Sequence, residues 1–266
     1  MTTNIRHGGP HAASGRHAGR VAIVTGASRG IGLAIAQRLV AEGAQVCLTA
    51  RKQEALNVAA AEFPAGSVLA IAGRSDDAAH RAEVFDSVAE HFGHLDVLVN
   101  NAGTNTHFGS LLDIELDAAR KMLEVNVLSN LAWVQDACKH PRLDFVRVGN
   151  SIINMSSVTG NVPSHGIGFY GVSKAALSHL TKTLASELGP QIRVNAIAPA
   201  VVKTRFSTAL YEGKEEEVVS AYPLKRLGVP EDIAAAVSFL ASDDAAWVSG
   251  QVLGLDGGLL AAGGTA

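Results

Sequence analysis

Residues 21–32 read VAIVTGASRGIG, a short continuous apolar run followed by a glycine-rich turn. A strand that is covered by protein on both faces is apolar at every position, as residues 21–24 are. Apolar residues then recur at helical spacing over 31–40 and stop at Glu42-Gly43. Backbone N–H groups of such a turn, at the positive end of a helix, bind a pyrophosphate. The stretch therefore predicts a buried strand, a nucleotide site and a helix; the alternative is a tight turn without a ligand.

The same alternation of apolar runs and helix-period segments continues to the C-terminus. Further strands are expected at 46–48, 68–71, 97–99, 152–153, 194–197 and 252–253. Helices are expected over 54–63, 76–92, 115–139, 169–188 and 230–241. This order predicts a doubly wound parallel α/β sheet of the Rossmann type, in a single catalytic domain over residues 19–266. Residues 201–228 lack a strand signal and predict a long excursion over the strand ends, where ligands bind in such sheets.

Composition excludes several classes of function. The chain has 266 residues, 47% of them hydrophobic, and 22 basic against 25 acidic residues give a net charge of −3. Without a basic block, neither nucleic acid nor a membrane is an expected partner, and no apolar run reaches the roughly 20 residues of a membrane span. Cys47 and Cys138 lie in apolar segments, which favours a reducing cytoplasm and neither a disulfide nor a metal site. Residues 1–18, rich in His, Gly and Ala, predict a disordered tail.

The glycine spacing and the end of the second strand bear on the cofactor. The turn has the spacing G-x-x-x-G-x-G, and its predicted cofactor contacts are Gly26, Ser28, Arg29, Gly30, Ile31 and Gly32. NAD sites place an acid about 20 residues after the glycines, at the end of the second strand. This chain has Arg51 and Lys52 there, and a guanidinium grips the extra phosphate of NADP. We therefore expect NADP(H); the alternative is that both cations begin a solvated helix, with Glu54 as the acid.

Tyr170 and Lys174 predict an acid/base pair. Residues i and i+4 of a helix share one face, so the phenol and the ammonium become neighbours. A tyrosine has an ordinary pKa of about 10, and a nearby positive charge lowers it toward neutrality. Such a pair can protonate a carbonyl oxygen while hydride arrives at the carbon. Taken alone, this spacing is also common on surface helices that have no catalytic role.

Several motifs in one order resemble those of the short-chain dehydrogenases/reductases. They are the glycine turn, Asn100-Asn101-Ala102-Gly103, Asn126, Ser157, Tyr170-x-x-x-Lys174, Arg193-Val194-Asn195 with Pro199, and Asp256-Gly257-Gly258. The resemblance covers about residues 19–260 and is greatest to NADPH-dependent carbonyl reductases and 3-oxoacyl-carrier-protein-reductase-like members. It also implies a homotetramer, or a dimer. A helix that is apolar around much of its girth, as residues 170–188 are, agrees with a subunit interface.

The resemblance implies a role for each catalytic residue. Tyr170 would be the general acid for ketone reduction, and Lys174 would lower the pKa of Tyr170 and hold the nicotinamide ribose. Ser157 would polarise the substrate carbonyl, with Ser156 as second choice, and Asn126 would place a water of a proton relay. Further cofactor contacts are implied at Asn100, Ala102, Gly103, Tyr170, Lys174, Pro199, Val202 and Thr204. The alternatives are that Asn126 is a cap or cross-link, and that the serines are turn residues. His165 is interpreted as an exposed loop residue without a catalytic role.

The chain departs from the family pattern at three places. Gly73-Arg74 stands where the family often has an adenine-contacting Asp, and Asp76 is a candidate substitute. Ala200 replaces the usual glycine after Pro199, and residues 139–150 predict an unusual surface loop.

The substrate pocket is expected to form from Asn105, His107 and Phe108, from residues after Ser157, and from the excursion. The excursion contributes Val201, Val202, Phe206, Leu210 and Tyr211, which favour a neutral, apolar ketone. The expected function is an NADPH-dependent carbonyl reductase. The alternatives are a 3-oxoacyl thioester reductase, for which Lys203, Arg205 and Lys214 would steer an acyl carrier, and a non-catalytic NADP-binding regulator.

Overall fold

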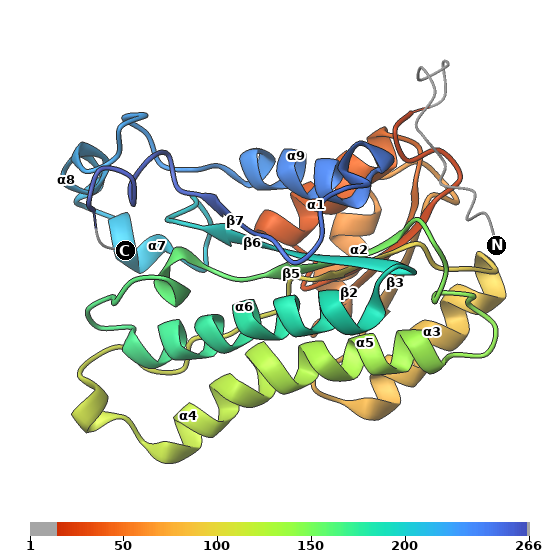
Figure 1. Ribbon diagram of the computed structural model, residues 1–266, viewed down its shortest axis with the longest axis horizontal. Coiled ribbons are helices and arrows are strands. Elements are labelled where there is room, and N and C mark those ends of the chain that lie inside the picture. Colours follow the sequence, from red (N-terminus) through yellow and green to blue (C-terminus); the bar gives the residue numbers. More distant parts are fainter. Residues whose placement is uncertain (1–14, 265–266) are drawn as a thin grey trace.

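The computed structural model describes residues 15–264, which form a three-layer α/β domain with helices on both faces of one sheet (Figure 1). Every predicted strand is present, and neighbouring strands are parallel, in the order β3-β2-β1-β4-β5-β6-β7. The strands are β1 Val21–Thr25, β2 Gln45–Ala50, β3 Val68–Ala72, β4 Val97–Asn100, β5 Asn150–Met155, β6 Ile192–Pro199 and β7 Val252–Leu255. The doubly wound parallel fold predicted from the alternation of apolar runs is confirmed.

The predicted helices are present, with one subdivision, and two short helices that were not predicted lie within residues 201–228. The α-helices are α1 Gly30–Ala41, α2 Gln53–Ala60, α3 Ala78–His91, α4 Leu116–Leu123, α5 Ser129–Lys139, α6 Gly168–Leu188, α7 Thr208–Tyr211, α8 Glu215–Ser220 and α9 Pro230–Ala241. The helix expected over 115–139 is α4 and α5 joined by a π-helical turn, Glu124–Leu128. Short 3₁₀ turns occur at Leu111–Asp113, Val158–Gly160 and Asp243–Ala245. None of the helices in the described part is long and apolar enough to cross a membrane.

Two hydrophobic cores, one on each face of the sheet, explain the continuous apolar run of β1. Ala22 and Val24 pack into the core under α1 and α9, whereas Val21 and Ile23 pack into the core against α3, α5 and α6. Figure 1 shows α1 and α9 on the opposite side of the sheet from α3, α5 and α6. Because successive side chains of a strand point to opposite faces, burial on both sides requires an apolar residue at each position.

The strand order reverses between β1 and β4, and this reversal positions the site. The chain proceeds outward from β1 through β2 to β3, then returns to pair β4 with the other side of β1. Crossovers on opposite sides leave a crevice beyond the carboxyl ends of these two strands. The glycine turn follows β1 and the Asn101-Ala102-Gly103 segment follows β4, so the topology brings both motifs to one crevice.

The tail predicted over residues 1–18 is wrong for its last part. Residues 1–14 lie outside the described residues, but residues 15–18 pack against the domain. The His17 side chain is fully buried, with Nε2 3.1 Å from the Ser238 carbonyl oxygen, and its backbone N–H donates to the Glu42 carbonyl at 2.8 Å. Composition hides this contact, because a histidine among Gly and Ala carries no apolar periodicity.

The segment 139–150 is a connection between α5 and β5, as expected, but it is fixed to the domain at two points. Leu143 and Phe145 are buried in the core beneath it. Arg147 donates to Asp96 Oδ1 at 2.7 Å, while Asp96 Oδ2 accepts from the backbone of Val21 at 2.8 Å. The loop is therefore anchored to the beginning of β1, at the end of the sheet away from the glycine turn.

Candidate active site

The glycine turn has the close packing and the open helix end that a bound phosphate requires. Gly26 and Gly30 have φ of +68° and +56°, which only glycine adopts readily. A Cβ on Gly32 would lie 2.5 Å from the Gly26 carbonyl oxygen and 2.6 Å from Asn101 Nδ2. At the first turn of α1 there is no side-chain cap and no acidic residue. Its positive end is therefore not neutralised by the described protein groups, and the turn fits an anionic phosphate.

A cavity of about 1250 Å³ extends from this turn to α6. Its size and its two ends fit a dinucleotide with a substrate beside it. Fifteen of the predicted cofactor residues line it: Gly26, Ser28, Arg29, Gly30, Ile31, Gly32, Arg51, Lys52, Ala102, Gly103, Tyr170, Lys174, Pro199, Val202 and Thr204. Asn100 is the exception, because it is buried behind the crevice and donates to Asn154 Oδ1 at 3.0 Å. Its role here is to join β4 to β5.

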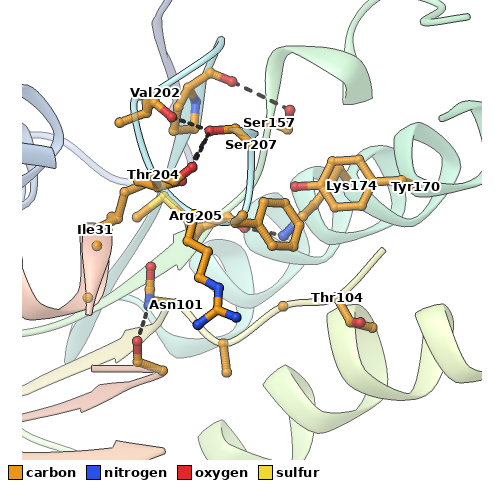
Figure 2. A pocket seen from close by; sticks show the side chains of 18 of the residues that line it. Ile31, Asn101, Thr104, Ser157, Tyr170, Lys174, Val202, Thr204, Arg205 and Ser207 are labelled. Carbon is orange, nitrogen blue, oxygen red and sulfur yellow. Dashed lines mark hydrogen bonds between the residues drawn. The ribbon is translucent and has the colours of Figure 1, made fainter. Parts of the chain in front are cut away.

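Tyr170, Lys174 and Ser157 meet at one end of this cavity (Figure 2). Tyr170 and Lys174 lie one turn apart on α6, with Lys174 Nζ 5.4 Å from the centroid of the phenol ring. Ser157 follows β5, donates to the Pro199 carbonyl at 3.4 Å and shares a hydrogen bond with Tyr170. Ser156 instead hydrogen-bonds the Lys174 carbonyl at 3.1 Å and Ser178 Oγ at 2.7 Å. Ser157 is therefore the serine that faces the phenol, whereas Ser156 fixes α6 to the sheet.

The ionisation of the pair differs from the sequence-based expectation. Removal from water raises the pKa of Tyr170, and the hydrogen bond with Ser157 opposes that rise only in part. Burial lowers the pKa of Lys174 to about 8. The prediction that Lys174 lowers the pKa of Tyr170 is therefore wrong for this structure. Both groups are desolvated, and Lys174 Nζ donates to the Met155 carbonyl at 2.6 Å. In this state Tyr170 carries its proton and is a donor.

Asn126 lies behind Lys174 and does not line the cavity. It is fully buried in the π-helical turn, where its Nδ2 donates to the Thr104 carbonyl at 2.9 Å and its Oδ1 accepts from the Thr104 N–H at 2.8 Å. A Cβ on Gly103 would lie 3.4 Å from both Asn126 Oδ1 and Lys174 Nζ. Asn126 therefore cross-links the segment after β4 to the helix, which is the structural alternative to a relay. Its part in a proton relay remains a prediction.

The adenosine end of the cavity carries several cations. Arg51 and Lys52 follow β2, are exposed and line the cavity, whereas Glu54 lies outside the lining. Asp76 also lines the cavity, but it is paired with two cations: Arg74 Nη2 lies 2.9 Å from Asp76 Oδ2, and Lys121 pairs with the same oxygen. These two cations hold the pKa of Asp76 well below its usual range. With both partners engaged, Asp76 is not a free substitute for the missing aspartate. The place of a side chain at Gly73 is instead filled by the His80 ring, 2.2 Å from a built Cβ.

The substrate end differs in detail from the expected lining. Thr104 and Thr106 line the cavity in place of Asn105, His107 and Phe108. Val201, Val202, Phe206 and Leu210 line it as expected, whereas Tyr211 packs beside a small core of Tyr222, Leu227 and Leu259. His165 is exposed, as expected, but borders the cavity.

Sequence reasoning missed Tyr222 and Leu259 as lining residues. Tyr222, in the last part of the excursion, reaches back to its first residue, with the Tyr222 hydroxyl accepting from the Val201 N–H at 3.3 Å. Leu259 comes from the C-terminal segment after Asp256-Gly257-Gly258, where Leu224 N–H donates to the Gly257 carbonyl at 3.1 Å. The glycine pair was the available signal, since it marks a close backbone approach. Ala200, the departure from the usual glycine, also lines the cavity.

A parallel sheet with a phosphate-binding turn at its switch point and a Tyr–Lys–Ser cluster in the same crevice defines a nucleotide-dependent oxidoreductase. A family model described as "Enoyl-(Acyl carrier protein) reductase" matches residues 26–260. The chain is 37% identical over 249 residues to tropinone reductase-like 3 of Erythroxylum coca, covering 91% of this chain and 94% of that protein. It is 40% identical over 250 residues to dehydrogenase/reductase SDR family member 4 of Oryctolagus cuniculus, with coverage of 91% and 94%.

Solved structures agree with these relatives. A short-chain dehydrogenase/reductase from Brucella melitensis superposes with a TM-score of 0.86 at 28% identity, covering 92% of this chain and 98% of that one. A blue fluorescent protein from a metagenomic library, in complex with NADPH, gives a TM-score of 0.83 at 33% identity, with coverage of 92% and 99%. The chain belongs to the short-chain dehydrogenase/reductase family of oxidoreductases, which use NAD(H) or NADP(H).

Proposed function

We propose that this chain reduces a ketone or aldehyde with NADPH. The observation that carries the proposal is one cavity with a phosphate-binding turn and the Arg51–Lys52 cations at one end, and Tyr170 with Ser157 at the other. NADPH would supply the hydride; Gly26–Gly32 backbone groups would hold its phosphates, and Arg51 its additional phosphate. The solved relative bound to NADPH supports this choice of nucleotide.

The protein's part in the reaction follows from the donors at the α6 end. The hydroxyls of Ser157 and Tyr170 would both donate to the carbonyl oxygen of the substrate, where negative charge develops during reduction. Tyr170, protonated because its pKa is raised, would then transfer its proton to that oxygen. Lys174 would then return a proton to Tyr170, since the Lys174 pKa of about 8 places this group near the working pH. The ring of Phe206, 6.1 Å from that of Tyr170, would keep water from the phenol.

The experiment follows absorbance of the reduced nicotinamide with NADPH or NADH and a panel of ketones, aldehydes and 3-oxoacyl thioesters. Turnover should occur with NADPH, be weaker with NADH, and fall by at least about 10²-fold in Tyr170→Phe, which keeps the ring and removes the proton donor. Tyr170→Phe should still bind NADPH, because the other cofactor contacts remain, and this separates loss of chemistry from loss of binding. NADPH binding without turnover of any carbonyl would favour the regulator alternative. Preference for NADH would contradict the role of Arg51.

A 3-oxoacyl thioester reductase is the second candidate. Lys214, exposed at the cavity lining, carries a positive charge that an acidic acyl carrier would meet, and the matching family model is named for a carrier-protein substrate. Faster turnover of carrier-bound 3-oxoacyl thioesters than of small ketones, with a loss in Lys214→Glu, would favour this candidate. Equal turnover of both substrate types by wild type and Lys214→Glu would exclude it.

We further propose a cytoplasmic homo-oligomer, a tetramer or a dimer. Leu128 and Val172 leave about half of their surface exposed on the helical face that carries α5 and α6, and Trp247 is fully exposed near β7. Two separate apolar patches favour two contacts per subunit, as a tetramer requires. Cys47 and Cys138 are both free thiols, which suits a reducing compartment. Sedimentation of wild type and Val172→Glu tests the assembly, because a charge within a subunit contact would lower the oligomeric state.

A further inference from the structure

Arg205 is a cation of the cavity for which the described protein supplies no partner. It lies in the turn between β6 and α7, is exposed, and lines the cavity. Figure 2 shows its guanidinium projecting from the turn into the cavity, toward the segment that runs from Asn101 to Thr104. Within residues 15–264, no hydrogen bond or ion pair engages this guanidinium. A guanidinium directed into a cavity without an acid beside it has its donors free for an anionic ligand.

The other cations of the same excursion show that this arrangement is particular to the cavity. Lys203, two residues earlier, pairs with Glu215 and does not line the cavity. Arg226 pairs with Asp232 at 2.6 Å, and Lys225 donates to the Ser220 carbonyl at 2.8 Å. Among the described cations of the excursion, only Lys214 resembles Arg205 in lining the cavity. The sequence presents Lys203 and Arg205 as equivalent charges, and the fold separates them.

The turn that carries Arg205 is held directly above the phosphate-binding end of α1. Thr204 approaches Gly30 so closely that a Cβ on that glycine would lie 3.4 Å from Thr204 Cγ2. Hydrogen bonds close the turn, with Ser207 N–H donating to the Thr204 carbonyl at 3.1 Å and Thr208 Oγ1 to the same carbonyl at 3.0 Å. Ser207 Oγ also donates to the Val202 carbonyl. The base of the Arg205 side chain is therefore fixed beside the glycine turn.

The residue after Arg205 marks the other boundary of the site. Phe206 contacts the ring of Tyr170, where the carbonyl and the nicotinamide would react. Arg205 is thus placed between the glycine turn and the proton donor. In a dinucleotide that spans these two ends, the anionic group between the sugars is the diphosphate. Planar guanidinium groups bind phosphate oxygens in pairs, which suits this position.

We infer that Arg205 is an affinity-determining contact that binds the diphosphate of the dinucleotide from the side opposite the glycine turn. This inference rests on the proposed dinucleotide binding but not on the choice between NADPH and NADH, because both carry the diphosphate. It assigns separate tasks to two arginines. Arg51 would distinguish NADPH from NADH, whereas Arg205 would strengthen the binding of both equally.

The test measures dissociation constants by fluorescence titration for NADPH, NADH and adenosine 2′-phosphate, which lacks any 5′-phosphate. Arg205→Met should weaken the binding of NADPH and of NADH by the same factor, about tenfold or more, because it removes a charged hydrogen bond. The dissociation constant of adenosine 2′-phosphate should stay unchanged in Arg205→Met. Arg205→Lys, which keeps the charge but not the paired donors, should fall between wild type and Arg205→Met. Lys203→Met, which removes a positive charge from the same segment outside the cavity, should change every constant less than about twofold.

Unchanged dinucleotide binding in Arg205→Met would overturn the inference, whether or not the KM of a carbonyl substrate rises. Binding of adenosine 2′-phosphate that is weakened by the same factor in Arg205→Met would also overturn the inference, because Arg205 would then act at the adenosine end. Arg51→Met separates this result from the choice of nucleotide, since it should weaken NADPH and adenosine 2′-phosphate but not NADH. If Arg51→Met has no effect while Arg205→Met weakens both dinucleotides, the NADP preference fails and the diphosphate contact stands. Circular dichroism of each variant verifies the fold.

Discussion

Replacing Lys174 by methionine should stabilise the protein while abolishing its turnover. The Lys174 side chain is only 3% exposed, and burial lowers its pKa from 10.5 to about 8. At pH 7 the folded protein therefore holds a charged group at a disadvantage of about 3 kcal/mol relative to the unfolded chain. Methionine keeps the length of the stem and removes the charge. It also removes the hydrogen bond from Nζ to the Met155 carbonyl, and a buried acceptor left unpaired costs about 1–2 kcal/mol.

The cost of the buried charge exceeds the cost of the unpaired carbonyl, so a net gain of about 1–2 kcal/mol in the free energy of unfolding is expected at pH 7. The gain should disappear as pH rises. Between pH 8 and 10.5 the folded state has released the Lys174 proton while the unfolded state retains it, so the stability of wild type rises through this window. By pH 10 wild type should equal or exceed Lys174→Met in stability.

Urea unfolding without nucleotide, at pH 7 and pH 10, measures both values. Lys182→Met is the matched control, because Lys182 lies on the same helix but is exposed, and its removal should leave the pH dependence unchanged. A Lys174→Met variant that is less stable than wild type at pH 7, by an amount independent of pH, would refute the reasoning. In that case the ammonium would be stabilised by its surroundings, and its burial would not oppose the folded state.

Two further predictions concern the tail residues and the glycine turn. Burial lowers the pKa of His17 from 6.5 to about 4, so the free energy of unfolding should fall by up to about 3 kcal/mol as pH falls from 6.5 to 4. In urea unfolding, His17→Leu should lose less stability than wild type over that window. An equal pH dependence in both proteins would contradict this. In Gly32→Ala, contacts of 2.5 Å and 2.6 Å should lower the unfolding free energy by about 1–3 kcal/mol and weaken NADPH binding. The gain of about 1 kcal/mol in helix propensity is smaller than that loss. Gly254→Ala, whose Cβ would meet no atom within 4 Å, is the control, and equal effects in both variants would disprove the packing argument.

Local spacing in the sequence is sufficient to determine the fold and most of the site. The all-apolar run of β1 predicts cover on both faces, and the two cores provide it. The glycines of the turn specify a backbone that only glycine adopts, with positive φ at Gly26 and Gly30. Tyr170 and Lys174 share a helix face because of their spacing. Each of these features depends on residues within about two turns or one strand of one another, so the sequence alone predicts them.

Features that depend on distant segments were decided only by the tertiary structure. His80 fills the space beside Gly73, and His17 is buried against Ser238, 221 positions away. Lys203 and Arg205 have the same charge in the sequence, but one pairs with Glu215 and the other projects into the cavity. The rise in the Tyr170 pKa likewise follows from desolvation by surrounding elements. Periodicity within one element predicts which side of it is buried, but which groups meet there, and whether water reaches them, depends on how separate elements pack.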